Sequence, residues 1–182
     1  MARIPYPDPS HEFTTLSVQL NLFRMLAHVG TTGKRVLSLG NALLSQLELQ
    51  PKLRELAILQ VAHEAGADYE WVQHVPLARS AGVTQEQIEA IEQGSMPDSL
   101  FTGQERQVLI FSKEVYRGST ISDEDFAAMT QAFTSREIVE LLLTTGYYTM
   151  LARFMTVLEI DIDEPAGERL LAPFSSQGPK GG

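Results

Sequence analysis

The sequence of 182 residues contains no cysteine. Disulfide bonds, thiolate nucleophiles and sulfur-ligated metals are therefore excluded. Basic residues are also few, because 14 Lys and Arg stand against 23 Asp and Glu, which gives a formal net charge of -9. Binding to nucleic-acid phosphates needs clustered Lys or Arg, and the chain has no such run, so we expect no nucleic-acid partner.

Long apolar runs are missing as well. The first 13 residues have no basic region followed by an apolar segment, so they do not resemble a secretory signal peptide. The longest uncharged apolar stretch, residues 141–152, is shorter than the roughly 20 residues that a helix needs to cross a bilayer. We therefore expect a soluble, cytoplasmic protein with no membrane partner.

No segment alternates apolar and polar residues as a half-buried strand does, whereas helix signals recur along the chain. Thr is followed three residues later by Gln or Glu, ahead of an apolar-periodic run, in three pairs: Thr84 with Gln87, Thr102 with Glu105, and Thr134 with Glu137. Each pair is typical of the capping box at a helix start. With 43% hydrophobic residues, the pattern predicts an all-α fold of about eight helices in a single domain over residues 1–182.

The two ends of the chain differ from its middle. Three prolines within five positions predict an extended N-terminal arm over residues 1–13. Helical periodicity then predicts a helix over residues 15–29 and another over residues 33–46. Residues 173–182 are rich in Ser, Gly and Pro, which favours a flexible tail.

The most informative stretch begins with a helix predicted over residues 53–65, which is apolar on most sides and is therefore typical of a core helix. Glu55 lies within it, where a carboxyl group is costly unless it is paired or used. Asp68 is expected to cap the next helix, on which Glu70 and His74 are four residues apart and so share a face. Two acids and one imidazole are thus predicted to point inward.

The segments LRELAILQVA (residues 53–62) and YEWVQH (residues 69–74) resemble the carboxymuconolactone decarboxylase and alkylhydroperoxidase D superfamily. The resemblance extends to residues 135–154. In the alkylhydroperoxidases a glutamate is followed after twelve residues by a Cys-x-x-Cys pair, and a histidine lies four residues beyond the second cysteine. The matching positions here hold Glu55 and His74, with Ala67 and Glu70 in place of the two cysteines.

This resemblance implies an alkylhydroperoxidase D-like helical bundle that needs no cofactor and no metal. It also implies a homotrimer or homohexamer, with sites near the subunit interfaces. Two carboxylates and one imidazole suit several divalent ions, so a metal site made of Glu55, Glu70 and His74 is the less favoured alternative.

The candidate catalytic residues are Glu55, His74 and Glu70, and the candidate substrate-binding residues are Tyr69, Trp71, Tyr148 and Arg153. Each has a plainer interpretation. Glu55 can be the ion-pair partner of Arg153, and Glu70 can be a solvated acid paired with His74. The aromatic residues can be ordinary packing residues. Arg153 can hold a substrate carboxylate or pair with an acid at position 137, 140 or 159.

Three functions are compatible with these residues. The favoured one is a cofactor-free acid/base enzyme acting on a small organic acid or lactone through Glu55 and His74, as the decarboxylase branch implies. The second is hydroperoxide reduction, which needs two thiols that the chain lacks. The third is a non-catalytic helical oligomer that binds a small ligand.

Overall fold

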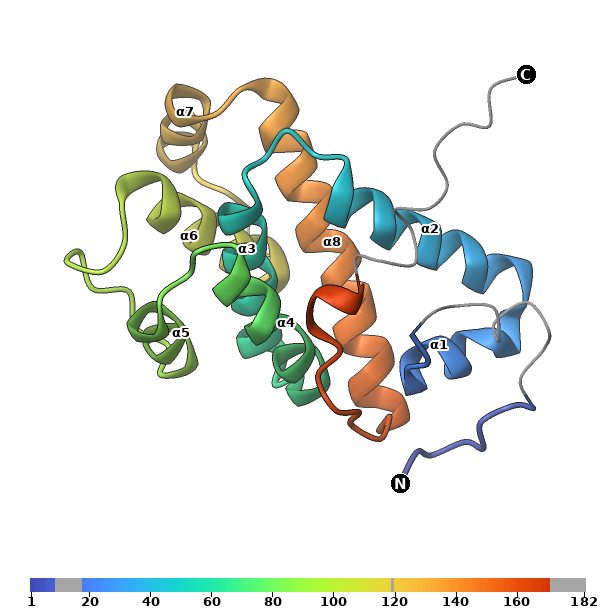
Figure 1. Ribbon diagram of the computed structural model, residues 1–182. Coiled ribbons are helices and arrows are strands. Elements are labelled where there is room, and N and C mark those ends of the chain that lie inside the picture. The colour runs from blue at the N-terminus through green and yellow to red at the C-terminus, as the bar shows by residue number, and fades with distance from the viewer. Residues whose placement is uncertain (9–17, 119, 171–182) are drawn as a thin grey trace, which may run out of the picture.

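The computed structural model describes residues 1–8, 18–118 and 120–170, and within them every regular element is helical (Figure 1). The prediction of an all-α fold with about eight helices is confirmed. The α-helices are α1 (Asn21–Leu26), α2 (Thr31–Ser45), α3 (Pro51–Ala65), α4 (Asp68–Ser80), α5 (Gln85–Glu92), α6 (Gly103–Arg117), α7 (Asp123–Ala132) and α8 (Ser135–Leu158). Two short 3-10 helices cover Ala27–Val29 and Gly167–Leu170.

Local signals place most helix ends correctly. Thr84, Thr102 and Thr134 form the three predicted capping boxes. The expected cap at Asp68 is wrong, because Asp68 is the first residue of α4 and Ala67 precedes it without a side-chain cap. A left-handed Gly66 already turns the chain sharply between α3 and α4, so the two helices follow each other with only two residues between them.

The first helix is shorter than predicted. Within the predicted range 15–29, α1 begins only at Asn21, and residues 15–17 lie outside the described ones. The backbone N–H of Asn21 donates to the Asp163 carboxylate over 2.7 Å. The acceptor at this helix start therefore comes from the far end of the chain, which a local sequence pattern does not reveal. The predicted tail at 173–182 and residues 9–13 of the predicted arm also lie outside the described residues.

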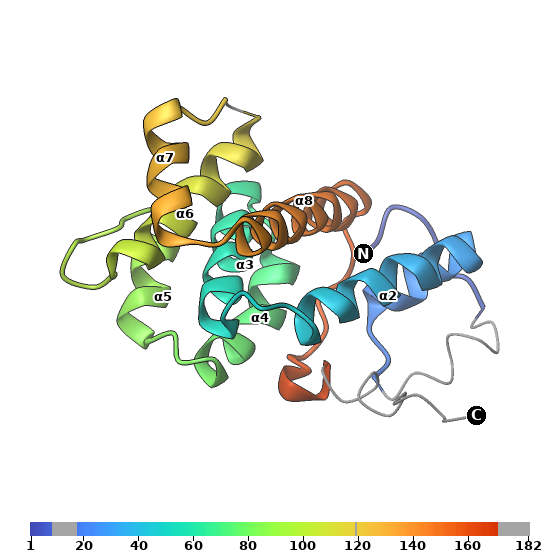
Figure 2. The same ribbon diagram turned by 90° about the horizontal axis from the view of Figure 1, so that it is seen from above.

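Helix α3 lies at the centre of the bundle (Figure 2). Its middle residues Leu56, Ala57, Ile58 and Leu59 are 0% exposed. It contributes to two apolar clusters, one shared with α1, α2, α4 and α8, and the other shared mainly with α5, α6 and α7. A helix with core on several sides explains why the sequence of α3 is apolar almost all round.

After α8 the chain runs back along α4. The Gln73 side chain holds this return, since its amide group donates to the Asp163 carbonyl over 3.1 Å and its oxygen accepts from the Ala166 N–H over 3.0 Å. The 3-10 helix Gly167–Leu170 is thereby brought beside α4 (Figure 1). Across the described ranges, no helix has the length and apolar character needed to cross a membrane.

Two helical glycines give opposite predictions for substitution by alanine. A methyl group at Gly40 would collide with the hydroxyl of Tyr147, which donates to the Val36 carbonyl over 3.0 Å. Nothing lies within 4 Å of a methyl group at Gly146. We expect Gly40→Ala to lower the free energy of unfolding by about 1–3 kcal/mol, and Gly146→Ala to raise it by up to about 1 kcal/mol. Urea unfolding of both variants would measure these changes in the free energy of unfolding. Equal changes for the two variants would contradict the close packing of Gly40 in α2 against Tyr147 in α8.

Candidate active site

Glu55 lies in the core of α3 and is 0% exposed. One carboxylate oxygen accepts from the Arg54 guanidinium, from Nε over 3.0 Å and from Nη2 over 2.9 Å. The other oxygen lies 2.9 Å from Nδ1 of His74. Arg54 also donates through Nη1 to the Leu44 carbonyl on α2 over 2.8 Å. The basic partner of Glu55 is therefore its neighbour in the sequence, Arg54, and not Arg153.

His74 is buried and is oriented by this carboxylate. A carboxylate can only accept, so the facing Nδ1 of His74 carries a hydrogen, and in the neutral imidazole the lone pair is on Nε2. The ring of Tyr148 meets the imidazole edge to face, with the ring centroids 4.9 Å apart. These contacts fix both the tautomer and the orientation of His74.

Glu70 is 2% exposed, and neither of its carboxyl oxygens has a hydrogen-bond partner among the described residues. The alternative pairing of Glu70 with His74 is therefore not formed. Burial raises the pKa of Glu70 well above its ordinary value of 4.5. The raised pKa favours the neutral carboxylic acid, which can donate one hydrogen bond and accept others.

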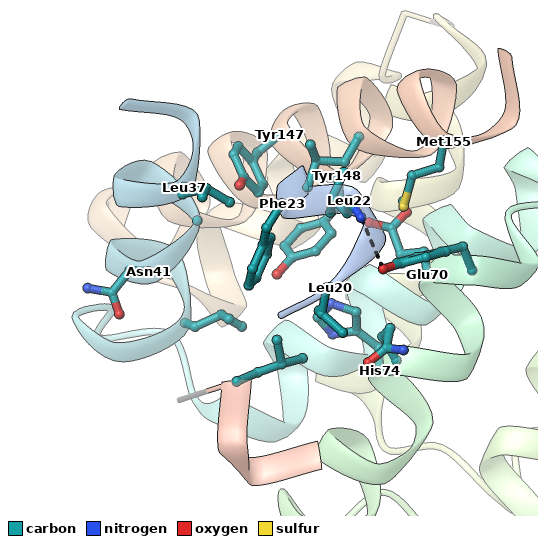
Figure 3. A pocket seen from close by; sticks show the side chains of 16 residues that line it. Leu20, Leu22, Phe23, Leu37, Asn41, Glu70, His74, Tyr147, Tyr148 and Met155 are labelled. Carbon is teal, nitrogen blue, oxygen red and sulfur yellow. Dashed lines mark hydrogen bonds between the residues drawn. The ribbon is translucent and has the colours of Figure 1, made fainter. Parts of the chain in front are cut away.

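His74 and Glu70 line the same cavity, which has a volume of about 580 Å³ including its open mouth (Figure 3). Its walls come from α1, α2, α4, α8 and the 3-10 helix Gly167–Leu170. The apolar lining residues are Leu20, Leu22, Phe23, Leu37, Leu44, Leu151, Met155 and Leu170. A concave, mostly apolar site with a few polar groups is typical of a small-molecule pocket.

Two of the four predicted substrate-binding residues line this cavity, namely Tyr69 and Tyr148. The Tyr69 hydroxyl accepts from the Leu22 N–H over 3.3 Å and donates to the Asp163 carboxylate over 2.5 Å. Burial, and then the negative charge of Glu55, raises the pKa of Tyr148 well above 10.0. Tyr148 is therefore a neutral phenol beside the imidazole.

Trp71 and Arg153 do not line this cavity. Trp71 is half-buried and packs against the apolar cluster on the other side of α3. Arg153 is exposed, and its guanidinium lies 5.1 Å from the ring centre of Tyr116. The acids at positions 137, 140 and 159 hydrogen-bond to other groups.

The structure adds residues that sequence reasoning missed. Arg54 carried a readable signal, because it is a second charged residue in a helix that is apolar almost all round. Phe23, Tyr147 and Leu170 line the cavity from three separate elements. Their convergence depends on how α1, α8 and the C-terminal 3-10 helix pack, and no local pattern indicates it.

Glu55, Glu70 and His74 do not gather as a metal-binding group. Over the described ranges, no set of three or more His, Asp or Glu side chains is arranged to hold a metal ion. In Glu55, both oxygens are already engaged by Arg54 and His74. The arrangement of Glu55, Glu70 and His74 therefore suits proton transfer better than metal coordination.

Residues 31–113 match the sequence model of the carboxymuconolactone decarboxylase family. This segment contains both Glu55 and His74. This match and the shared fold of the solved structures described below support membership of the carboxymuconolactone decarboxylase and alkylhydroperoxidase D-like superfamily. A comparison with curated proteins finds no match.

Solved structures of this superfamily fold share the architecture at low sequence identity. An uncharacterized peroxidase-related protein from Silicibacter sp. TM1040 is 19% identical, with a TM-score of 0.73 over 88% of this chain and 90% of that chain. A peroxidase-related protein from Ralstonia eutropha JMP134, described as an alkylhydroperoxidase AhpD core, is 18% identical, with a TM-score of 0.73 over 93% and 95% of the two chains. The debrominase Bmp8 is 15% identical, with a TM-score of 0.70 over 88% and 86%.

The neutral state of Glu70 makes folding stability depend on pH. In the unfolded chain Glu70 ionises near its ordinary pKa of 4.5, whereas the buried group keeps its proton to higher pH. The folded protein then binds more protons than the unfolded chain, so this contribution to stability falls as pH rises above 4.5. We expect Glu70→Gln to gain stability relative to the wild type as the pH rises above about 5, on the order of 1.4 kcal/mol for each unit by which burial raises the pKa of Glu70.

Glu105 is a matched control, because its pKa is shifted in the opposite direction to that of Glu70. Burial opposes ionisation there, but the Lys52 ammonium and the Thr102 N–H outweigh it and lower the pKa of Glu105. Glu105→Gln should therefore lose stability relative to the wild type as the pH rises from acid values to about 5, with little further change above that pH. Urea unfolding across the pH range measures both differences, and a pH-independent difference for Glu70→Gln would contradict a neutral buried acid.

Proposed function

We propose that this protein is a cofactor-free acid/base enzyme that acts on a small cyclic carbonyl compound such as a lactone. The single observation that carries the proposal is that an imidazole and a buried, unpartnered carboxyl group line one apolar cavity. The base is Nε2 of His74, and the acid is the unpartnered carboxyl group of Glu70. Acid and base groups in different environments are the usual basis of proton-transfer catalysis.

Glu55 has a different role from the one that its spacing to His74 in the sequence suggests. Both of its oxygens are occupied by Arg54 and His74, and it is fully buried. It is therefore a positioning residue, which holds the imidazole tautomer and stabilises the imidazolium formed when His74 takes a proton. Arg54 in turn holds Glu55.

The proposed reaction needs only proton movements. The Glu70 hydroxyl donates a hydrogen bond to the substrate carbonyl oxygen, while His74 Nε2 removes a proton from the neighbouring carbon. The electron pair of the broken C–H bond moves toward the carbonyl oxygen and gives an enolate that the Glu70 hydrogen bond stabilises. The imidazolium then returns the proton to the same carbon or another one. In a substrate with a carboxylic acid placed β to the carbonyl, His74 Nε2 would take the acid proton. The bond to the carboxyl carbon would then break with loss of carbon dioxide to give the same enolate, which the imidazolium would protonate at carbon.

The charge of the cavity favours a neutral substrate over a free organic acid. None of the lining side chains is Lys or Arg among the described residues. The Arg54 guanidinium is committed to Glu55 and to the Leu44 carbonyl. A substrate carboxylate would therefore lose its hydration without gaining a bidentate partner.

Assembly into a homotrimer or homohexamer is part of this proposal. Support comes from α8, along which several large apolar side chains are about half exposed. These are Val139, Leu142, Leu143, Met150 and Val157. A row of exposed apolar side chains on one helix is typical of an interaction surface.

Replacing the base should abolish proton transfer. In heavy water, the wild type should exchange the α-protons of small lactones and cyclic ketones for deuterium, followed by proton NMR. We expect His74→Ala to slow this exchange by at least about a hundredfold, because a positioned general base contributes that much or more.

His63→Ala is the matched control, since His63 lies on α3 outside the cavity. It should keep the wild-type rate. Equal exchange by the wild type and His74→Ala would contradict the proposal, and binding without any exchange would favour a non-catalytic ligand carrier.

Hydroperoxide reduction is the alternative that the related branch suggests. The positions of the two redox cysteines hold Ala67 and Glu70, and the chain has no cysteine elsewhere. Because no thiolate is present to attack a peroxide, we expect no consumption of alkyl hydroperoxide with a dithiol as reductant. Consumption above the rate of the dithiol alone would contradict this expectation.

A further inference from the structure

The carboxyl group of Glu70 stands out among the buried polar groups. It is 2% exposed, and both of its oxygens are without a hydrogen-bond partner in the described part of the chain. Buried polar atoms in native proteins are nearly always paired, so two unpaired oxygens on one side chain require an explanation. Because this side chain lines the cavity, a bound ligand is the natural partner.

The other polar groups in the lining are largely engaged elsewhere. Gln73 uses both ends of its amide on residues 163–166, and the Tyr147 hydroxyl donates to the Val36 carbonyl. The Tyr69 hydroxyl is held by Leu22 and Asp163. In Figure 3 the Asn41 amide points away from the other labelled side chains. Besides Nε2 of His74 and the Tyr148 hydroxyl, Glu70 is then left to recognise a polar ligand edge, and it presents two oxygens side by side.

We propose that Glu70 recognises a cyclic amide, such as a lactam, by pairing both carboxyl oxygens with the carbonyl and the N–H of the ligand. The inference deepens the proposed function and rests on it for the assumption that the cavity takes a small carbonyl compound. A carboxylic acid presents an O–H donor beside a C=O acceptor. An amide whose N–H and C=O lie on the same side presents the complementary edge.

The ligand is predicted to be cyclic because a ring fixes the conformation of its amide bond. Open-chain secondary amides are trans, with the N–H and C=O on opposite sides, so they cannot pair with one carboxyl group through both atoms. A ring of five or six atoms holds the amide cis. The apolar walls from Phe23, Leu37 and Met155 suit the carbon atoms of such a ring.

Three probes of nearly the same shape test this on the whole wild-type chain. δ-Valerolactam has the N–H, N-methyl-δ-valerolactam has lost it, and δ-valerolactone replaces it with oxygen. We expect the lactam to bind about tenfold more tightly than the other two in calorimetric or NMR titrations, since one hydrogen bond is gained. Equal affinities, or no lactam binding at millimolar concentration, would overturn the proposal. Preferential binding of the cation piperidinium would overturn it too, because that ligand requires ionised Glu70.

Variants of Glu70 distinguish its hydrogen bonds to the ligand from the general packing of the ligand in the cavity. Glu70→Gln keeps a neutral donor beside an acceptor, so it should retain the lactam preference. Glu70→Leu has neither and should bind the three probes equally. His63→Ala, which lies outside this cavity, is the control and should behave as the wild type. A lactam preference that survives in Glu70→Leu would assign the recognition to another residue and overturn the proposal.

The titrations do not depend on turnover, so the two proposals can fail separately. A lactam preference without any α-proton exchange would leave the recognition standing and end the catalytic proposal. Exchange that depends on His74, together with equal probe affinities, would do the reverse.

Discussion

The hydrogen-bonded ion pair between Arg54 and Glu55 is the interaction on which the site depends. A carboxylate that is 0% exposed in the central helix would be strongly unfavourable without a partner. Arg54 satisfies one oxygen and leaves the other for His74. Because the same guanidinium also bonds to the Leu44 carbonyl, it ties α2 to α3 at the edge of the cavity. Site geometry and helix packing are therefore held by one side chain.

Two glutamates fifteen positions apart in the sequence differ in their environment and hence in their chemistry. Glu55 accepts hydrogen bonds at both oxygens from Arg54 and His74. Glu70 has no partner within the described ranges, and burial raises its pKa. One carboxyl group thus orients a base, and the other remains a proton donor.

The sequence predicts the fold class well, because its helix signals are local. The capping boxes at Thr84, Thr102 and Thr134 each depend on residues three positions apart. The late start of α1 at Asn21 could not be predicted, since its acceptor is Asp163. In the site, the spacing of Glu55 and His74 placed both on inward faces. The expected role of Trp71 relied on nearness to the motif along the chain, and that of Arg153 relied on the family resemblance. Side chains that are close in sequence can point to opposite sides of a helix, as these two do relative to the cavity.

The protonation state of Glu70 at neutral pH tests the central claim most directly. Infrared difference spectra between the wild type and Glu70→Gln, recorded in heavy water at neutral pH, isolate the vibrations of this one side chain. The account predicts the carbonyl stretch of a protonated carboxylic acid, which disappears in the variant. The symmetric and antisymmetric stretches of an ionised carboxylate in its place would contradict the account, because His74 would then face a second base where the proposed chemistry needs an acid.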